Sequence, residues 1–351
     1  MRFKVAIVDK DNLYLQRIAR VFSEKYADNM DLYSFSSLEA FENRNVTARF
    51  DMVLYGEGII PVEDIPNGQH AMYLVSQADI DKVEGVSAIC KYQKHEILFK
   101  KIVSFCIDQD NTNYIKKNVM GNACKVILVA GASGGSGTTT VATALSRFYA
   151  RNGKKVLYIT FEKNPATSLF FGSESESSFS DVIYMLKSKK SNIISRLENI
   201  VQRDETGVYF FNQCKTIFDM EELTDTDKKT LIEEICSFGE YDYVIMDDSI
   251  TCNKSGYAIC DYSDYIVLVS DGSKLSELKL DQISTVIGIW DAEKDARFRP
   301  KARVFYNGNL NPSESDEDRF VIMGAAPKFE GLTEKGVSER VSELGVFQQL
   351  A

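Results

Sequence analysis

The sequence is poor in the residues that build zinc centres. It has only two histidines, His70 and His95, and none of its seven cysteines belongs to a CxxC pair. Because zinc sites combine closely spaced cysteine and histidine ligands, these counts argue against a fold organised by zinc. The scattered cysteines predict reduced thiols that are mostly buried, as is usual in a reducing compartment.

Long apolar runs are missing as well. No stretch approaches the ~20 apolar residues that a membrane-spanning helix needs, and residues 1–9 lack the small-residue cleavage site of a signal peptide. The net charge of −10 and a pI near 5.0 argue against a surface that coats nucleic acid. These absences predict a soluble cytoplasmic protein whose contact with a membrane is at most peripheral and which does not bind nucleic acid.

The chain of 351 residues is long for a single domain. A polar segment from Asp108 to Cys124 interrupts the periodicity on both sides of it. We therefore predict a first domain at residues 1–110, a linker at 111–123 and a second domain at 124–351. In both domains short β-branched runs alternate with amphipathic helical patterns, which is typical of doubly wound α/β sheets with mostly parallel strands.

The expected elements follow from these patterns. In the first domain we expect strands at 3–8, 32–35, 51–55, 71–75 and 88–91, and helices at 13–25, 38–43 and 96–106. In the second domain we expect strands at 126–129, 155–159, 243–246, 265–269 and 302–306, and a helix at 138–152.

The first domain resembles the receiver domain of two-component response regulators, which has a flavodoxin-like fold. Asp9 and Asp11 follow the first strand, where receivers carry their metal-binding acids. Ser76 ends the fourth strand at the position of the switch hydroxyl, and Lys91 lies near the receiver lysine after the fifth strand. The resemblance therefore covers the layout and four functional positions.

One position departs from the receiver pattern. The phosphoacceptor aspartate should end the third strand, and there the chain has Gly56. Glu57 is adjacent, but one step along a strand turns a side chain to the other face. The first domain is therefore predicted to be a pseudo-receiver that takes no phosphate and acts in docking or dimerisation.

A glycine-rich loop opens the second domain. Residues 125–140, KVILVAGASGGSGTTT, read as an apolar strand, a loop and a helix start. Gly134, Gly135 and Gly137 let the backbone curl so that its amides point inward as an anion-binding nest. The positive end of the helix that begins near Thr138 adds to this attraction. The segment therefore predicts a phosphate site.

Two further residues predict a magnesium ion beside the phosphates. Thr139 occupies the loop position whose hydroxyl ligates Mg²⁺ in such loops. Asp247 ends the expected strand at 243–246, where an acid of this kind holds the same ion through water. The predicted cofactors are ATP and Mg²⁺.

The loop lacks its usual lysine, because Thr138 stands directly after the last glycine. A charged hydrogen bond contributes about 1.5–3 kcal/mol, and groups that clamp phosphate charge in the transition state are worth about 10³-fold or more in rate. No obvious replacement lysine stands out in the sequence. We therefore expect ATP–Mg²⁺ to bind and hydrolysis to be very slow or absent, which makes the protein a weak ATPase at most.

The whole second domain resembles the ParA/MinD superfamily of deviant Walker ATPases. That family carries KGGxGK[ST]T, and residues 133–140 here read SGGSGTTT. Its signature lysine, which reaches the partner's phosphates across a dimer, is Ser133 in this chain. The resemblance implies a P-loop ParA/MinD-like fold and a homodimer through this domain. It assigns nucleotide contacts to Ser133, Gly134, Gly135, Ser136, Gly137, Thr138, Thr139, Thr140, Asn307 and Pro327.

The same resemblance points to one catalytic candidate. The family has an Asp-x-Asp motif at the end of the strand after the loop, and residues 160–162 here read TFE. Glu162 is therefore the surviving acid that could orient a water molecule for slow turnover. A solvated loop glutamate is an equally good interpretation of this residue.

A pseudo-receiver ahead of such an ATPase resembles the TadZ/CpaE-like proteins of tight-adherence (Flp) pilus assembly. That resemblance implies a spatial organiser that places the pilus or secretion apparatus at a cell pole and binds its proteins. The alternative is an active ParA/MinD-type ATPase in partitioning or division-site positioning. A transcriptional response regulator is disfavoured, because no helix-turn-helix follows the receiver.

Two other segments carry expectations. Residues 335–350 have apolar residues at helical spacing, which predicts a C-terminal helix that packs on the core rather than on a membrane. Residues 297–303, RFRPKAR, form a basic cluster. We expect a solvated loop there, with contact to nucleic acid or an acidic partner as the alternative.

Overall fold

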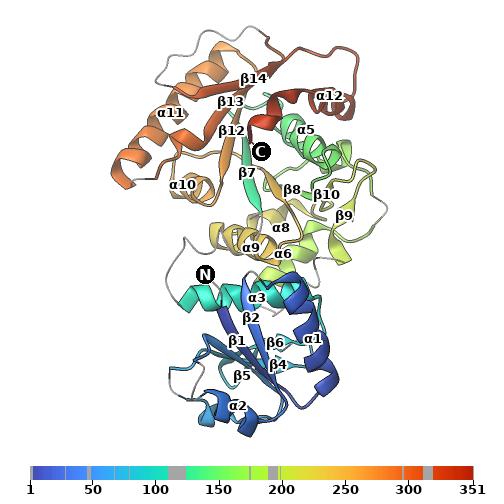
Figure 1. Ribbon diagram of the computed structural model, residues 1–351. Helices are drawn as coiled ribbons and strands as arrows, with labels where there is room; N and C mark the ends of the chain where they lie inside the picture. Colours follow the sequence, from blue (N-terminus) through green and yellow to red (C-terminus); the bar gives the residue numbers. More distant parts are fainter. Residues whose placement is uncertain are drawn as a thin grey trace. The chain divides into compact units, whose positions relative to one another are not determined.

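The computed structural model describes residues 3–350 except 28, 46–48, 67, 79, 110–123, 174, 189–196, 198, 295 and 311–318. The chain forms two compact units, of which the first holds residues 1–123 and the short segment 237–239 and the second holds the other residues (Figure 1). Each unit is built around its own mostly parallel sheet, which confirms the predicted α/β class with two doubly wound domains. The predicted linker lies outside the described residues, so the domain limits 1–110 and 124–351 stay a prediction.

The sheet of the first unit has the strand order β2-β1-β3-β4-β6-β5. All neighbours pair in parallel except β5, which pairs antiparallel at one edge. Without that edge strand the order is the 2-1-3-4-5 of flavodoxin-like folds. The elements are β1 (Phe3–Val8), α1 (Asn12–Lys25), β2 (Met30–Phe35), α2 (Leu38–Asn45), β3 (Met52–Gly56), the 3-10 turn Val62–Asp64, β4 (Ala71–Val75), β5 (Lys82–Val83), β6 (Val86–Cys90) and α3 (His95–Gln109).

Alternation along β1 distributes the core of this unit over both faces of the sheet. Val5 and Ile7 pack with buried side chains of α1 and α3 on one face. Ala6 and Val8 pack with Phe41 of α2 on the other face. Because successive strand residues point to opposite faces, a run of apolar residues is what a strand covered on both sides requires.

In the described part of the chain, strands and helices do not alternate between β3 and β6, which agrees with the expected elements, because no helix is predicted between residues 55 and 88. Among the described residues between β3 and β6, the chain forms the 3-10 turn Val62–Asp64 and the β5–β6 hairpin in place of helices. Pro61, Pro66 and Gly58 interrupt the first of these stretches, and each disfavours a continuous helix.

Gly56 ends β3 and lies against Asp9. A Cβ atom at Gly56 would stand 2.5 Å from Oδ2 of Asp9. The Asp9 carboxylate in turn forms a nearly buried ion pair with Lys91, with 3.2 Å between Nζ and Oδ2. Because any side chain at position 56 would push this carboxylate aside, glycine preserves the ion pair.

The neighbouring acid does not replace the missing phosphoacceptor. The Glu57 carboxylate accepts hydrogen bonds from the Ser76 amide at 3.2 Å and from the Ser76 hydroxyl at 2.9 Å. Asp11 caps α1 by accepting from the amides of Leu13 and Tyr14. Glu57 and Asp11 are therefore held in hydrogen bonds of the unit's own structure.

The sheet of the second unit has the order β14-β13-β12-β7-β11-β8-β10-β9, with only β9 antiparallel to its neighbour among the described strands. Its strands are β7 (Lys125–Gly131), β8 (Val156–Thr160), β9 (Gln202–Arg203), β10 (Tyr209–Phe210), β11 (Tyr243–Asp247), β12 (Tyr265–Ser270), β13 (Ala302–Asn307) and β14 (Val321–Ala326). Its α-helices are α5 (Thr138–Arg151), α6 (Phe179–Lys187), α8 (Ile217–Glu221), α9 (Asp225–Phe238), α10 (Lys254–Asp261), α11 (Lys274–Lys294) and α12 (Glu334–Val341), and its 3-10 turns are Thr167–Leu169, Arg299–Lys301 and Gly345–Leu350.

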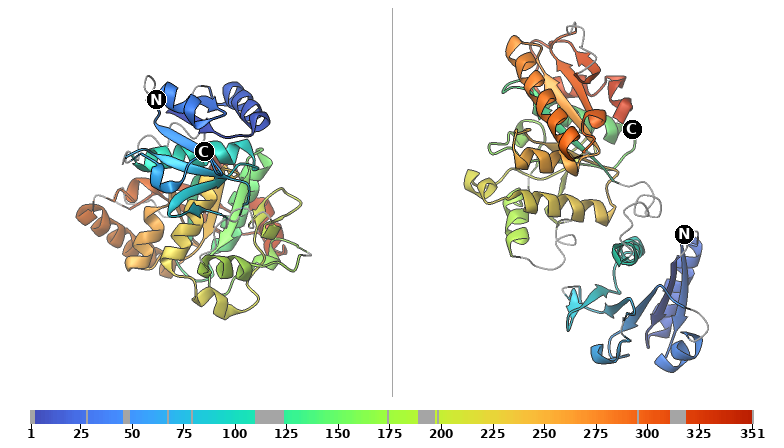
Figure 2. Two further views of the ribbon diagram at one scale, coloured as in Figure 1. Left: turned by 90° about the horizontal axis from the view of Figure 1, so that it is seen from below. Right: turned by 90° about the vertical axis from the view of Figure 1, so that its left-hand side faces the viewer.

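Helices cover both faces of this sheet. The views in Figures 1 and 2 show α11 and α5 on opposite sides of the strands. Leu128 and Ala130 of β7 pack in the cluster that includes α6, α9 and α11, whereas Ile127 and Val129 pack in the cluster that includes α5 and α12. The central strand β7 therefore leads into its loop from a position buried on both faces.

The C-terminal segment differs from the predicted single helix at 335–350. The helix α12 ends at Val341, and Gly345–Leu350 form a separate 3-10 turn. Gly345 lowers helix stability, which explains the interruption. The predicted packing on the core is confirmed, because Val341, Phe347 and Leu350 are fully buried.

Two smaller expectations are wrong in part. The cluster at 297–303 is no solvated loop at its centre, because Phe298 is fully buried and the Arg299 guanidinium donates to the Arg319 carbonyl at 2.6 Å. The cysteines are free, but only Cys106 and Cys260 are buried. Among the described residues, no helix combines the length and the hydropathy needed to cross a bilayer.

We predict that Gly56→Ala destabilises the first unit by about 1–3 kcal/mol, because the new Cβ overpacks the site and displaces the Asp9 carboxylate from Lys91. Urea unfolding of the full chain, followed with a probe in the first unit, measures the change. The control is the same substitution in an Asp9→Ala background, where the clash is gone and the cost should shrink. An equal cost in both backgrounds would contradict this explanation.

Candidate functional site

The glycine-rich loop connects β7, which ends at Gly131, to α5, which begins at Thr138. Gly135 and Gly137 have φ angles of 81° and 85° in the left-handed region. Such angles favour glycine, and they turn successive amides toward one side of the loop. Gly134 and Gly135 are exposed, so their backbone can approach a ligand without a side chain in the way.

Asn307 at the end of β13 holds the backbone of the loop in place. Its side-chain amide donates to the Ser136 carbonyl at 3.1 Å. A Cβ atom at Gly137 would collide with this amide nitrogen. The contact with Asn307, like the left-handed φ angle, therefore requires glycine at this position. In this arrangement Asn307 holds the backbone of the loop, whereas the family resemblance assigns it to the adenine.

Ser133 is tied to the chain's own helix α11. Its hydroxyl lies 2.5 Å from the hydroxyl of Ser276, and both residues are buried. The position at which the family carries its signature lysine is therefore occupied by a short polar side chain with an internal partner. Thr138, at the second lysine position, lies 3.4 Å from the Ser136 hydroxyl.

Asp247 ends β11 with its side chain fully buried. One carboxylate oxygen accepts from the Tyr158 hydroxyl at 2.8 Å, and the other, Oδ1, has no hydrogen-bond partner. Burial and the nearby charge of Glu162 raise the pKa of Asp247 to about 7, although Thr139 acts in the opposite direction. The fold therefore brings Thr139 and Asp247 together, as the sequence predicts for a magnesium site.

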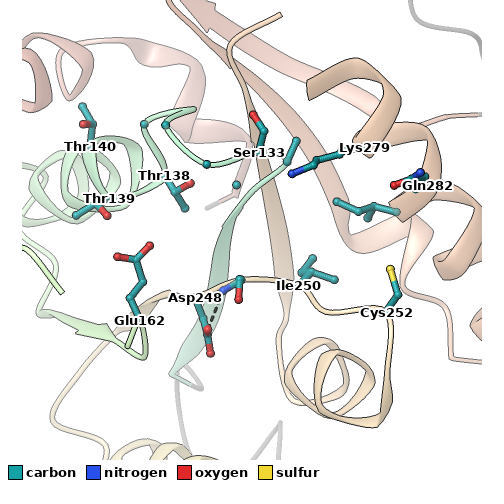
Figure 3. Close-up of a pocket in the computed structure, with 17 residues that line it drawn as sticks. Ser133, Thr138, Thr139, Thr140, Glu162, Asp248, Ile250, Cys252, Lys279 and Gln282 are labelled. Atoms are coloured by element: carbon teal, nitrogen blue, oxygen red, sulfur yellow. Dashed lines mark hydrogen bonds between the residues drawn. The ribbon is translucent and has the colours of Figure 1, made fainter. Parts of the chain in front are cut away.

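Two more acids stand at the same edge of the sheet. Burial and the charge of Asp248 raise the pKa of Glu162. Asp248 forms an ion pair with Lys228 at 2.7 Å, and burial nevertheless raises the pKa of its carboxyl group. Figure 3 shows the carboxylate of Glu162 turned toward the start of α5, where Thr138 and Thr139 lie.

These residues fit a magnesium ion. Mg²⁺ prefers hard oxygen ligands and is usually held by one or two carboxylates together with substrate phosphates. Oδ1 of Asp247 is a buried oxygen without a partner, and the Thr139 hydroxyl is a second oxygen beside it. The described residues contain no group of three or more His, Cys, Asp or Glu side chains that could hold a metal alone. The phosphates of a ligand would therefore complete the coordination.

A cavity of about 550 Å³ opens in front of the loop. It lies between the loop, the segment after β11 and one face of α11 (Figure 3). Its lining includes the predicted residues Ser133, Gly134, Gly135, Gly137, Thr138, Thr139, Thr140 and Glu162. The structure thus gathers most of the predicted site residues around one space.

Four predicted residues stand apart from that lining. Ser136 and Asp247 are buried behind the loop, and Asn307 holds its backbone. Pro327 follows β14 and is only half-buried. The side chains of these four residues therefore do not form the wall of the cavity, and Asp247 lies behind it.

Lys279 and Gln282 of α11 line the cavity and were missed by the sequence interpretation. They lie far from the loop in the chain, on a helix without a recognisable motif. Asp248, Ile250 and Cys252 after β11 were also missed as lining residues. In this segment the sequence interpretation had used only the pair Asp247 and Asp248 at the end of the strand.

Comparisons with known families bear on both units. Residues 1–107 match the model of a family described as a TadZ-like receiver domain. Residues 124–299 match the model of a family described as an AAA domain. A search of curated proteins finds no match.

Solved structures similar to this chain include ParA and MinD proteins. A ParA family ATPase from Chlorobium tepidum TLS is 17% identical, with a TM-score of 0.51, and the match covers 66% of this chain and 99% of that one. The MinD cell division protein of Aquifex aeolicus is 19% identical, with a TM-score of 0.49, and the match covers 65% and 96%. At these identities the first of them shows the fold alone.

We predict that Asp247→Asn stabilises the protein without metal and nucleotide at pH 8 by about 2–4 kcal/mol. The pKa of Asp247 is about 7 in the folded state, above the ordinary value of 3.8, so the folded state holds the proton between these pH values. That contribution to stability is complete below pH ~4 and is lost as the pH rises through 7. Asparagine does not ionise, so the variant does not lose this stability as the pH rises.

Urea unfolding in EDTA at pH 5 and pH 8 measures this effect. The stability difference between Asp247→Asn and the wild type should be small at pH 5 and large at pH 8. A difference of the same size at both pH values would show that the ionised carboxylate is not the cause.

Proposed function

We infer the function from one premise: this chain belongs to the ParA/MinD-like AAA-domain proteins and carries an N-terminal TadZ-like receiver domain. A ParA/MinD-like ATPase fold implies nucleotide and Mg²⁺ binding. We propose that the protein binds ATP with Mg²⁺, hydrolyses it very slowly or not at all, and acts as a spatial organiser. In this role it localises a tight-adherence (Flp) pilus assembly or secretion apparatus in the cytoplasm at a cell pole.

One observation supports ATP–Mg²⁺ binding above all. A loop with exposed backbone lies close to a buried carboxylate, that of Asp247, which has one oxygen without a hydrogen-bond partner. Gly134 and Gly135 present exposed backbone, and helix α5 begins directly after the loop. Behind them, Oδ1 of Asp247 lacks a partner while its neighbour Glu162 opposes ionisation. A divalent cation that enters with polyphosphate would give Oδ1 of Asp247 a partner and would also offset the negative charge of Glu162.

Weak hydrolysis follows from the charges at the loop. Ser133 and Thr138 replace the two lysines of the family pattern, so the loop itself brings no ammonium group to the phosphates. Backbone amides and the cation support binding, but they do less for the charge that develops in the transition state. The role of ATP is therefore structural more than catalytic.

The spatial role rests on the first unit. With Gly56 in place of the acceptor and Asp9 held by Lys91, phosphate has no place to attach. A receiver fold without phosphorylation retains its surfaces, which serve for docking to pilus or secretion proteins. This proposal is supported by the TadZ-like receiver match and by the absence of an acceptor at the end of β3.

We also propose a homodimer through the second unit that forms with or without ATP. Ser133 is bonded within its own chain to Ser276, so it supplies no charge to a partner's nucleotide. Leu275 and Leu278 on α11 are 57% and 58% exposed beside the cavity, an apolar surface that a second copy could cover.

The second candidate, an active ParA/MinD-type ATPase, is favoured by one feature. Glu162 lines the cavity, and its raised pKa brings it closer to the range of a general base. Turnover that rises on addition of DNA or liposomes would support this candidate over the organiser.

We predict that ATP binds in calorimetric titration with a micromolar or weaker Kd when Mg²⁺ is present. Thr139→Ala should lose the Mg²⁺ dependence, because the hydroxyl beside Asp247 is removed. The control Thr285→Ala changes an exposed threonine on α11 and should bind as the wild type does. Turnover should stay far below about one per second. A complete lack of ATP binding, or turnover near that rate, would refute the respective part.

We predict that the protein without nucleotide sediments as a dimer and that ATP shifts the equilibrium little. Leu278→Asp should weaken the dimer by placing a charge on its apolar surface. The control Leu332→Asp changes an exposed leucine outside α11. Monomers without ATP that become dimers only on its addition would contradict the proposal.

A further inference from the structure

Lys279 of α11 brings a cationic side chain to the wall of the cavity. Among the described residues that line the cavity, it is the sole lysine or arginine. Within the described part of the chain its side chain has no ion pair and no hydrogen bond. Figure 3 shows it extending from α11 with its nitrogen turned toward the side of the cavity where Ser133 lies.

A second lysine near the site provides a contrast. Lys228 lies 2.7 Å from the Asp248 carboxylate and stacks over the Phe161 ring, so its charge is already neutralised. The other charged side chains that line the cavity, among the described residues, are those of Glu162 and Asp248, whose like charges repel each other. An incoming polyphosphate would therefore meet one uncommitted positive side chain, that of Lys279.

The serine pair fixes the position of this lysine. Ser276 lies 2.5 Å from Ser133, at the place where the family pattern has its lysine. Lys279 is three residues further along the same helix, and residues three apart on a helix lie on one face. Gln282, another three residues on, lines the same cavity. The contact between Ser133 and Ser276 thus places Lys279 close to the position at which the family pattern has its lysine.

We propose that Lys279 supplies, from helix α11 of the same chain, the ammonium group that the loop lacks, and that it contacts the terminal phosphates of bound nucleotide. This inference rests on the proposed ATP binding. In this arrangement the positive charge at the phosphates comes from helix α11 and not from the loop. Lys279 is thereby a residue that selects nucleotides by their number of phosphates.

Calorimetric titration with ATP, ADP and AMP in Mg²⁺ tests the proposal on the full chain. In Lys279→Ala the Kd for ATP should rise about ten- to a hundredfold, the range of a charged hydrogen bond. The Kd for AMP should stay within about twofold, because AMP lacks the terminal phosphates. Lys279→Arg should recover most of the loss.

The matched control is Lys274→Ala, which removes an exposed lysine from the same helix at a site outside the cavity lining. It should leave all three Kd values unchanged. The dependence of the ATP Kd on salt should also be less steep in Lys279→Ala than in the wild type or the control, because one charge contact is gone.

The outcomes separate this inference from the function on which it rests. Wild-type protein that binds no ATP would refute the proposed function and the inference together. Wild-type binding that persists unchanged in Lys279→Ala would refute the inference alone. Equal weakening of ATP and AMP in that variant, or a fall in its melting temperature without ligand, would show a displaced helix and would also overturn the assignment.

Discussion

The candidate site depends on the burial of a single carboxyl group. Asp247 stands at the end of β11 between two other strands, where water does not reach its side chain. Tyr158 satisfies one of its oxygens, and the second oxygen has no partner. A buried polar atom without a partner costs about 1–3 kcal/mol. The fold tolerates this cost at the point where the loop, α5 and Glu162 converge.

The rest of the site is arranged around this unsatisfied group. The left-handed angles of Gly135 and Gly137 let the backbone of the loop curl, and Asn307 holds that backbone through the Ser136 carbonyl. Thr139 then falls beside Asp247 at the first turn of α5. Positive groups in the backbone and negative groups on the sheet edge therefore face the same cavity, which suits a ligand that carries both an anion and a cation.

The central strands and the loop could be predicted because their signals are local. Apolar runs such as 243–246 are buried on both faces, and parallel strands bring their carboxyl ends to one edge. This is why Thr139 and Asp247, which the sequence assigns to one magnesium site, lie close together in the fold. Asn307 was found as a site residue, although its observed contact is with the Ser136 carbonyl.

Other parts of the site could not be predicted, because they depend on packing between distant segments. Nothing in the sequence around Lys279 marks it, and its place follows from the contact of Ser276 with Ser133. The C-terminal helix was extended too far, since apolar spacing continues through Gly345 while the helix does not. Helical periodicity records which side chains are buried, and a 3-10 turn can bury the same ones.

The arrangement around Gly56 also bears on how the first unit can change over time. Receivers gain their activity from an aspartate at this position, yet an aspartate here would meet the Asp9 carboxylate at 2.5 Å from its own Cβ. The Asp9 carboxylate would have to move, which would break its ion pair with Lys91. The return of an aspartate at position 56 would therefore cost the first unit a nearly buried ion pair, so it would need further substitutions around it.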